Sequence, residues 1–266
     1  MVQNLNGLSV LVTRPVDQAE ALVAAIEAAG GLAQHCPVME IVALDQHRES
    51  ELIESNKHKI LALDNYHHII VISSNAAYAA LELIDDYWPQ LPLGLQWHAV
   101  GSTTAALLKS RGIAVSSCAG KAMNSEALLQ QGPLQQLSNN KIVIARGVGG
   151  REYLRQQLQS RGATVDYLEC YRRQLAATSA QLLQQQLAGV DAICLNSAES
   201  VDYFASLAGA QLSFAKALPV VVPSVRVADH AEKNGYSRVI VAQNASNLAV
   251  VAALKTVAVA AGVSPR

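Results

Sequence analysis

Two arginines flank a glycine-rich segment near the middle of the chain, Arg146-Gly147-Val148-Gly149-Gly150-Arg151-Glu152. Glycines between a strand and a helix would leave backbone N–H groups at a helix N-terminus, where unpaired donors and the helix dipole stabilise an anion. The guanidinium groups of Arg146 and Arg151 would add bidentate binding of a carboxylate or phosphate. The segment matches neither the dinucleotide-binding nor the Walker glycine pattern. It therefore predicts a general anion site, with a tight turn and an exposed arginine pair as the alternative.

Small polar residues follow three further apolar runs of the sequence, at 73–75 (SSN), 101–104 (GSTT) and 196–197 (NS). Taken singly, serine and asparagine in such places are more often helix N-caps than ligand contacts. The same places are the carboxyl ends of parallel strands, where open α/β sheets bind ligands. With the 146–152 segment, four such turns in one chain favour the hypothesis that some of them face a shared cleft.

Short apolar runs alternate with helical patterns along the whole chain. Residues 8–12 (LSVLV) predict a buried strand, and apolar residues at helical spacing predict a helix over 17–29, with Asp17 as its N-cap and Gly30-Gly31 as its end. Strands that alternate with helices imply parallel sheets covered on both faces, which is an α/β fold. Further strands are predicted at 69–72, 99–100, 142–144, 192–195, 220–222 and 239–241.

The first of two internal repeats aligns the segment from Val10 with the segment from Ile142 at a constant offset of 132. This register places Arg14 on Arg146 and Gly30 on Gly162. Any two strand–helix units look alike to some degree, which is the plain alternative. Long ungapped registers nevertheless favour a duplicated α/β domain.

The second repeat, at an offset of 123, pairs the strand at 69–72 with that at 192–195 and places Ser74 on Ser197. The same offset carries the 99–112 segment onto 222–235. Residues 33–44 and 164–174 occupy equivalent places after the two copies of the first repeat. They are either ordinary strands or the two connections between domains.

Composition narrows the class of protein. The 266 residues carry a formal net charge of −1 and are 51% hydrophobic, which is a globular composition without the basic surface expected for nucleic acid or anionic membranes. The four cysteines are far apart, and no histidine motif has metal-ligand spacing, so we expect no disulfide framework and no metal site. No signal peptide or confident membrane span is visible. The expected location is the cytoplasm.

No nucleophile elbow or other covalent triad is present in the sequence. Residue patterns alone therefore lead to a two-domain α/β protein that binds an anion. They leave the chemistry open.

The order of these segments resembles the uroporphyrinogen-III synthases over essentially the whole chain. No single motif is diagnostic of that family, but the co-linear set is specific. The segments that carry the resemblance are LVTRP, HCPVMEI, ISSNAA, AVGSTTA, NSEALL, IARGVGGRE, RGATVDYLECYRR, LNSAES, VVVPSVRVADHAEKNGY and VAQNASNLAVVAAL.

The resemblance implies two similar α/β domains joined by two extended strands, with the active site in the cleft between them. The first domain would comprise residues 1–36 plus 174–266, and the inserted second domain residues 37–173. An enzyme without a cofactor, acting on a small-molecule substrate, is implied. We expect a monomer with hinge motion at the two connections. The implied activity is that of a cyclising hydro-lyase, which closes hydroxymethylbilane to uroporphyrinogen III, inverts the last pyrrole and releases water.

The resemblance also implies roles for individual residues. Tyr171 matches the tyrosine of the family and is the candidate proton donor, with a structural tyrosine as the alternative, and Thr104 would bind or orient substrate. Pro223–Arg226 departs from the family's glycine- and threonine-rich turn, which leaves open any role of Ser224 or Arg226. Substrate contacts are expected at Arg14, Ser74, Asn75, Gly101, Thr103, Arg146, Gly147, Ser197 and Ser224.

Two other functions compete with this one. A non-catalytic two-domain clamp for an anionic metabolite would use the same turns without chemistry. A nucleotide-dependent transferase would use the 146–152 loop and would bind ATP or NAD.

Overall fold

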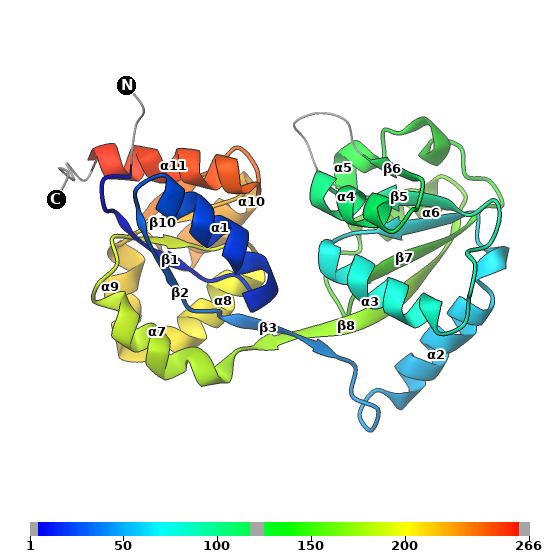
Figure 1. The fold of residues 1–266 in the computed structure, drawn as a ribbon, viewed down its shortest axis with the longest axis horizontal. Helices are drawn as coiled ribbons and strands as arrows, with labels where there is room; N and C mark the ends of the chain where they lie inside the picture. Colours follow the sequence, from blue (N-terminus) through cyan, green and yellow to red (C-terminus); the bar gives the residue numbers. More distant parts are fainter. Residues whose placement is uncertain (1–4, 118–124, 261–266) are drawn as a thin grey trace. The chain divides into compact units, whose positions relative to one another are not determined.

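The computed structural model describes residues 5–117 and 125–260 (Figure 1). The chain divides into two compact units, which we call unit 1 (residues 1–40 with 174–266) and unit 2 (residues 41–173). Both crossings between the units fall inside strands, β3 (Met39–Ala43) and β8 (Thr164–Leu175). The predicted pair of extended connections is therefore confirmed.

Unit 1 is built on a five-stranded sheet in the order β11-β10-β9-β1-β2, in which every pair of neighbours is parallel. Three of its central strands have no exposed residue, because helices cover both faces of the sheet. The strands are β1 (Ser9–Val12), β2 (Leu32–His35), β9 (Ala192–Cys194), β10 (Pro219–Val222) and β11 (Arg238–Val241).

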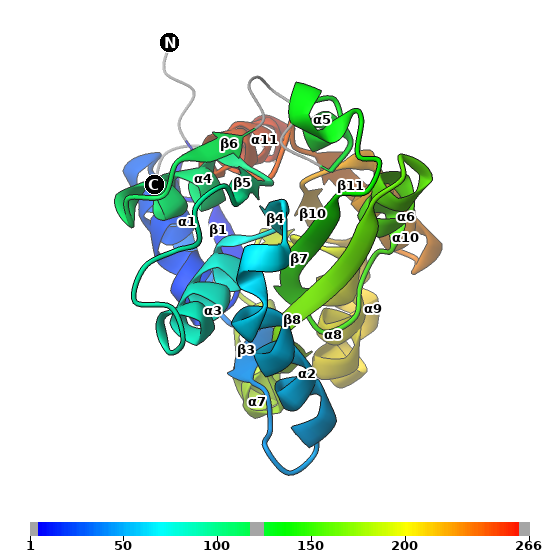
Figure 2. The same cartoon turned by 90° about the vertical axis from the view of Figure 1, so that its right-hand side faces the viewer.

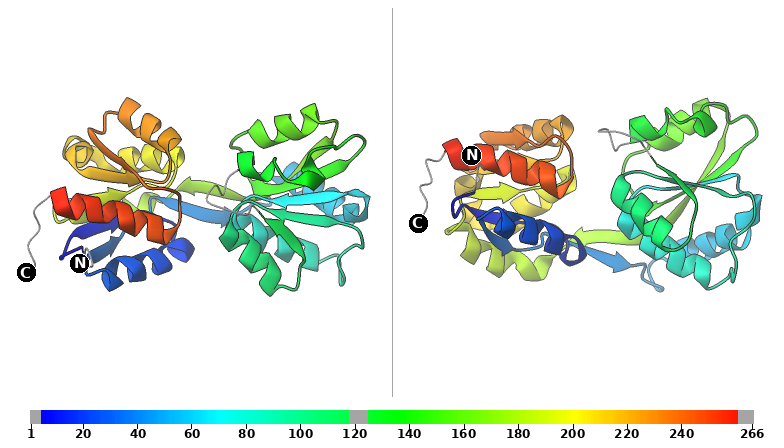
Figure 3. Two further views of the ribbon diagram at one scale, coloured as in Figure 1. Left: turned by 90° about the horizontal axis from the view of Figure 1, so that it is seen from above. Right: turned by 45° about the horizontal axis from the view of Figure 1, so that its top comes forward.

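Two helices, α1 (Val16–Ala28) and α11 (Asn247–Ala260), pack on one face of this sheet (Figure 3). The other face carries α7 (Ala180–Leu187), α8 (Ala198–Ala208) and α10 (Val225–Lys233), with the short α9 (Leu212–Ala217) beside them. None of the helices in residues 5–117 and 125–260 has the length and apolar character needed to cross a membrane.

Unit 2 is built on a six-stranded sheet in the order β3-β8-β7-β4-β5-β6 (Figure 2). The five strands from β8 to β6 are parallel. Besides β3 and β8, the strands are β4 (His68–Val71), β5 (Gln96–Ala99), β6 (Val115–Ser117) and β7 (Lys141–Gly147). Within residues 5–117 and 125–260, short 3-10 turns lie at Leu63–Asn65, Gly132–Leu134, Ala177–Ser179 and Gly209–Gln211.

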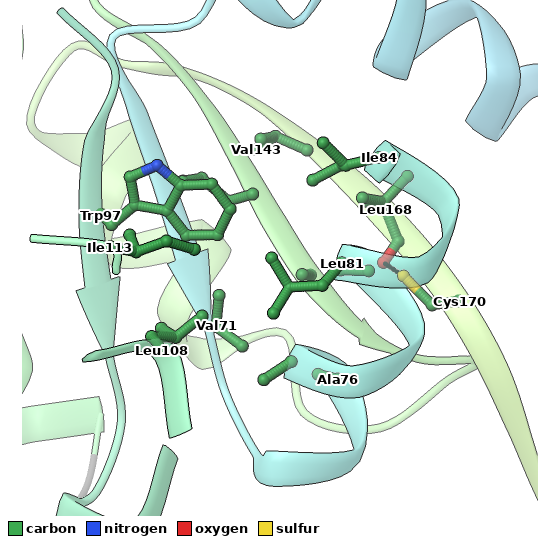
Figure 4. Packing of buried hydrophobic residues seen from close by; sticks show 14 of the residues in the cluster. Val71, Ala76, Leu81, Ile84, Trp97, Leu108, Ile113, Val143, Leu168 and Cys170 are labelled. Atoms are coloured by element: carbon green, nitrogen blue, oxygen red, sulfur yellow. Dashed lines mark hydrogen bonds between the residues drawn. The ribbon is translucent and has the colours of Figure 1, made fainter. Parts of the chain in front are cut away.

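One face of the unit 2 sheet packs against α2 (Ser50–Leu61), α3 (Ser74–Asp85) and α4 (Ser102–Ser110). Figure 4 shows the centre of this core, where Leu81 and Ile84 of α3 point toward Trp97 and Val143 of the sheet. The opposite face packs against the short α5 (Ser125–Leu128) and α6 (Tyr153–Ser160).

The strand registers confirm the first repeat. Val12 lies opposite Cys194 in unit 1, and Ile144 lies opposite Ile70 in unit 2, so β1 corresponds to β7 at the predicted offset of 132. Gly30 and Gly162 both adopt positive φ at the ends of the corresponding helices. Read in repeat order, the unit 1 sheet and the five parallel strands from β8 to β6 in unit 2 both have the order 2-1-3-4-5 of flavodoxin-like folds. This order places the switch point beside β1 in unit 1 and beside β7 in unit 2.

The offset predicted for the second repeat is wrong by one residue at the beginning of the repeat. The same registers equate Cys194 with Ile70, an offset of 124, whereas Val221 and His98 beside them are related by 123. The counterpart of Ser197 is therefore Ser73, and Ser74 is one residue further on. The segment from β4 to β5 is one residue longer than the corresponding segment from β9 to β10, which accounts for the change of offset. An ungapped alignment could not reveal this difference.

One local prediction is wrong. Asp17 is not the N-cap of α1, because the helix begins at Val16 after Pro15, whose fixed φ suits a helix start. In unit 2, His68 at the start of β4 is buried, with 3% of its surface exposed.

Candidate functional site

The predicted site residues lie where parallel strands end and helices begin. In unit 2, β4 leads into α3, β5 leads into α4, and β7 leads into the 147–152 loop. In unit 1, β9 leads into α8 and β10 leads into α10. All of these turns occupy the carboxyl edge of their own sheet, which is the ligand-binding edge of α/β folds.

The turn after β4 is capped by Ser73. The Oγ of Ser73 accepts a hydrogen bond from the backbone N–H of Ala76 at 3.1 Å, with Ser73 in an extended conformation typical of an N-cap. The predicted contacts Ser74 and Asn75 are the first two residues of the helix, and both are partly exposed.

The turn after β5 has no side-chain cap. Gly101 begins α4 with a φ of 94°, a conformation that favours glycine. Thr103 in the first helical turn is exposed, whereas Thr104 is 3% exposed. Thr103 therefore offers its hydroxyl to solvent, and the predicted orienting residue Thr104 does not.

Arg146, at the end of β7, is buried and holds the loop that follows it. Its guanidinium donates to the carbonyl oxygens of Gly149 and Arg151, pairs with Glu152 at 3.4 Å, and lies 4.3 Å from the ring centre of Tyr167. The side chain is 4% exposed. Most of its donors are thus directed at the protein itself, which is a structural arrangement.

The 147–152 loop also binds its own unit through its backbone. The N–H of Val148 donates to the carbonyl of Tyr171 at 2.8 Å, and the N–H of Gly149 donates to the carboxylate of Glu169 at 3.0 Å. An acidic residue, Glu152, precedes the helix. The sequence predicts that this segment leaves backbone N–H groups open to an anion, and this prediction is wrong for the N–H groups of Val148 and Gly149.

A pocket of about 210 Å³ lies beside this loop, on the α5 and α6 face of unit 2. Aliphatic side chains form part of its wall, and three arginines contribute to its lining, with no acidic side chain among the described residues that line it. Arg151 is 52% exposed there and pairs with Glu126 at 3.3 Å. The lining residues are Ile72, Val100, Ser125, Ile144, Arg146, Gly149, Gly150, Arg151, Tyr153, Leu154, Tyr167 and Arg173.

Tyr167 on β8 contributes an aromatic wall to the pocket. Its hydroxyl donates to Glu152 at 2.8 Å, and Arg146 and Arg155 both lie over its ring. Burial and then the bond to Glu152 raise the pKa of Tyr167 to about 12. The phenol is therefore neutral near pH 7 and acts as a donor.

Tyr171 lies on the opposite face of the sheet from Tyr167, although the two residues are four apart on one strand. Strict alternation along a strand would place both on the same face. A bulge changes this, because Arg146 pairs with Glu169 while Gly147 pairs with Tyr171. Tyr171 consequently joins Cys170 in the core cluster beneath α3.

The phenol of Tyr171 is held by two contacts. Its hydroxyl lies 3.2 Å from Oγ of Ser73, and its ring lies against Gly147, where an added Cβ would come within 2.7 Å of the ring. The structure thus brings together two predicted site residues, Tyr171 and Gly147, with Ser73.

In unit 1, Arg14 repeats the structural arrangement of Arg146. Its guanidinium donates to the side-chain oxygen of Asn247 at 2.8 Å and to the carbonyl of Ala245 at 3.1 Å, at the start of α11. Burial lowers the pKa of Arg14 from its usual value. His35 lies 2.9 Å from the Arg14 carbonyl and restrains the same turn.

The two serines of unit 1 differ in how they are used. Ser197 and Ser200 form a capping box at the start of α8, with bonds of 3.0 and 2.9 Å. Ser224 begins α10 without a side-chain cap bond, and Arg226 after it is exposed.

Three apolar side chains stand exposed at helix starts on this edge of unit 1. Val16 is 67%, Val225 65% and Leu248 83% exposed. Val16 and Val225 are the first residues of α1 and α10, and Leu248 is the second residue of α11, beside the polar turns described above. This edge of unit 1 therefore presents apolar surface next to backbone and hydroxyl donors.

Sequence reasoning missed several of these residues. Ser73 lies in the predicted 73–75 turn, but the ungapped repeat equates Ser74 with Ser197, so the sequence assigns Ser73 no role of its own. Tyr167 and Arg173 could have been found from the strand pattern of TVDYLECYRR, but their partners lie far away in the sequence. Among the described residues, no group of three His, Cys, Asp or Glu side chains could hold a metal ion.

A family model described as uroporphyrinogen-III synthase HemD matches residues 20–252, which include the turns described above except the one at Arg14. The chain belongs to the uroporphyrinogen-III synthase family. The uroporphyrinogen-III synthase of Salmonella typhimurium is 31% identical over 256 residues, covering 93% of this chain and 100% of the relative. That of Escherichia coli is 29% identical over 262 residues, with 93% and 100% covered.

Solved structures agree with the fold. A mutant uroporphyrinogen III synthase from Thermus thermophilus superposes with a TM-score of 0.59 at 16% identity, covering 94% of this chain and 98% of that one. The uroporphyrinogen-III synthetase of Helicobacter pylori gives 0.57 at 12% identity, covering 92% and 97%. At such identities the likeness establishes the α/β fold, while the family is established by the sequence.

Proposed function

We propose that this protein is a uroporphyrinogen-III synthase, which converts hydroxymethylbilane to uroporphyrinogen III. The observation that carries the proposal is the family match over residues 20–252, together with a 31% identical synthase aligned over its whole length. The turns at the carboxyl edges of the two sheets supply the donors that such a substrate requires.

The substrate is a chain of four pyrroles that carries many carboxylates, so it needs both apolar surface and hydrogen-bond donors. Val16, Val225 and Leu248 would contact pyrrole faces, since they are exposed apolar side chains beside polar turns. Arg151 would attract a carboxylate in the unit 2 pocket, with the aliphatic wall contacting the adjoining ring. We propose further contacts at Asn75, Ser74, Thr103, Ser197 and Ser224, and at the backbone of Gly101 and Gly147.

The chemical step that needs a proton is the departure of the terminal hydroxyl group. We assign its donor to Tyr171. The C–O bond breaks, the phenol proton joins the leaving oxygen to form water, and the lone pair of the pyrrole nitrogen supplies the electrons, leaving an azafulvenium cation. Attack on that cation by the substituted carbon of the last pyrrole forms a spiro intermediate. Fragmentation and reclosure invert that ring, and the proton released on closure restores the phenol.

Arg14 and Arg146 are given a supporting role in this proposal. Their guanidinium groups already hold the turns before α11 and before α6. Thr104 is buried in the first turn of α4 and would position that turn for Thr103 and Gly101.

Isomer analysis tests the proposal. Purified protein would receive freshly generated hydroxymethylbilane, and the oxidised products would be separated into type I and type III uroporphyrin. We expect predominantly type III, slowed strongly by Tyr171→Phe and less by Thr104→Ala. Type I alone, formed at the rate of the protein-free control, would refute the activity and would favour a non-catalytic clamp for an anionic metabolite.

We also propose that the enzyme acts in the cytoplasm as a monomer and needs no cofactor. The support is the near-neutral charge and the four widely separated cysteines, three of them buried as free thiols. Light scattering of the purified protein would show one 28.2 kDa chain if the monomer is correct, and a stable dimer would contradict it.

A further inference from the structure

We infer that Ser73 is a positioning residue for Tyr171, donating a hydrogen bond to the phenol oxygen so that the phenol proton is free for the leaving group. The inference rests on the proposed function. It concerns one contact within unit 2, the 3.2 Å approach of Ser73 Oγ to the Tyr171 hydroxyl.

Either hydroxyl could donate in this pair, and the surroundings of Ser73 favour donation by the serine. A hydroxyl has one proton to donate and two lone pairs that accept. One lone pair of Ser73 Oγ accepts the N–H of Ala76 at 3.1 Å. That bond polarises the serine hydroxyl and makes it a stronger donor, because hydrogen bonds in a chain reinforce one another. Its position at the positive end of the α3 dipole acts in the same direction.

A serine that donates to the phenol oxygen would assist proton transfer. When Tyr171 gives up its proton, the negative charge remains on that oxygen. A hydrogen bond to the charged form stabilises it. Ser73 therefore both directs the phenol proton away from itself and stabilises the phenolate that forms.

Gly147 leaves the space that the ring occupies in this position. A Cβ at residue 147 would lie 2.7 Å from Cε2 and 2.8 Å from Cζ of Tyr171, which is closer than packed atoms approach. Glycine is needed here for space, since its φ is not among the positive values that favour glycine. The bulge between Arg146 and Gly147 then turns the phenol toward Ser73.

Unit 1 contains the same cap without the tyrosine. Ser197, the counterpart of Ser73, has φ and ψ of −157° and 163°, against −159° and 164° for Ser73. Its hydroxyl accepts from the N–H of Ser200, which closes the capping box. In unit 1, Ser197 therefore caps its helix only, whereas in unit 2 Ser73 caps its helix and also contacts the phenol of Tyr171.

Three substitutions of Ser73 separate capping from donation. Ser73→Ala removes both, Ser73→Asp keeps a capping oxygen but has no proton to donate, and Ser73→Thr keeps both. We expect Ser73→Ala and Ser73→Asp to lower kcat about tenfold with KM changed less than about twofold, and Ser73→Thr to restore kcat. Ser197→Ala serves as a stability control, because it shows what the loss of a cap alone does to Tm.

The decisive test is a double-mutant cycle with Tyr171→Phe. If Ser73 acts through the phenol, Ser73→Asp should lower kcat less than twofold once the phenol is gone. An undiminished loss in the Tyr171→Phe background would overturn the inference, because the serine would then act on something else.

A spectroscopic measurement keeps this inference distinct from the proposed function. In protein labelled with ¹³Cζ-tyrosine, the Tyr171 resonance, assigned with Tyr171→Phe, should shift in Ser73→Ala and return in Ser73→Thr. An unmoved resonance would refute the hydrogen bond whatever the activity. If the resonance shifts and the wild-type protein makes only type I product, the hydrogen bond stands but the proposed function and the catalytic role of Ser73 both fail.

Discussion

Nδ1 of His68 lies 3.1 Å from Nε2 of His98 inside unit 2. Each outer ring nitrogen of the pair contacts a side-chain amide. Nδ2 of Asn140 lies 3.0 Å from Nε2 of His68, and Oε1 of Gln131 lies 3.3 Å from Nδ1 of His98. With the amide of Asn140 donating and that of Gln131 accepting, each ring has one N–H and one acceptor nitrogen. The network is therefore complete only while both histidines are neutral.

This network predicts that unit 2 loses stability as the pH falls. Burial, with His98 and His67 nearby, lowers the pKa of His68 to about 4, whereas an unfolded histidine titrates near ~6.5. Between these values the unfolded chain binds protons that the native chain does not, so the free energy of unfolding falls as the pH falls from 6.5 to about 4. It then levels off. A shift of this size corresponds to at most about 3 kcal/mol for one buried group.

Urea unfolding followed by tryptophan fluorescence would measure this loss, because both tryptophans, Trp88 and Trp97, belong to unit 2. His68→Gln should flatten the pH dependence above pH 5. His58→Gln is the control, since the His58 side chain is 71% exposed. An equal pH dependence in wild type and His68→Gln would contradict the prediction.

Gly147→Ala should damage the site through steric contact. The new methyl group would lie 2.7 Å from the Tyr171 ring, so the ring or strand β7 must move. We expect unit 2 to lose about 1–3 kcal/mol and type III formation to fall sharply. Gly132→Ala is the matched control, because an added Cβ there meets nothing within 4 Å. Normal activity of Gly147→Ala would show that the ring position is unimportant.

Substitution of Arg146 should lower the stability of unit 2, whereas substitution of Arg151 should raise KM. Arg146→Lys loses the fork of donors that holds the 147–152 loop, and we expect unit 2 to lose about 3 kcal/mol in tryptophan-monitored unfolding. Arg151→Ala removes an exposed side chain and should change stability by less than about 0.5 kcal/mol while raising KM severalfold. Unchanged stability with a raised KM in Arg146→Lys would assign that arginine to the substrate instead.

Much of the fold was visible in the sequence because parallel strands covered on both faces are continuous apolar runs. LSVLV and the run at 220–222 are examples, and both are strands of unit 1. The duplication was visible because Arg14 and Arg146, or Gly30 and Gly162, occupy the same place in each copy.

The site was less predictable because its residues meet through tertiary structure. The face occupied by Tyr171 depends on one bulge, which no alternation pattern reveals. The identity of the cap, Ser73 in place of Ser74, depends on a one-residue difference between repeats. The arginines looked like ligand contacts, yet their donors go to backbone carbonyls and to an asparagine far away in the sequence.

Arg14 offers a direct test of this structural role in unit 1. Its bonds to Asn247 and to the Ala245 carbonyl join the end of β1 to the start of α11, 233 residues away for the Asn247 contact. We expect Arg14→Ala and Asn247→Ala each to cost about 1–2 kcal/mol, and the double variant to cost about 1 kcal/mol less than their sum, because the two residues share one bond.

Tryptophan fluorescence would not report on this change, since unit 1 contains no tryptophan. Amide hydrogen exchange would, and protection in α11 should fall in Arg14→Ala and Asn247→Ala alike. Arg226→Ala is the matched control, as an exposed arginine in the first turn of α10 on the same unit. Strictly additive losses would show that the Arg14–Asn247 bond does not stabilise the unit. Unchanged exchange in α11 together with a raised KM would show that Arg14 binds substrate and does not hold the helix.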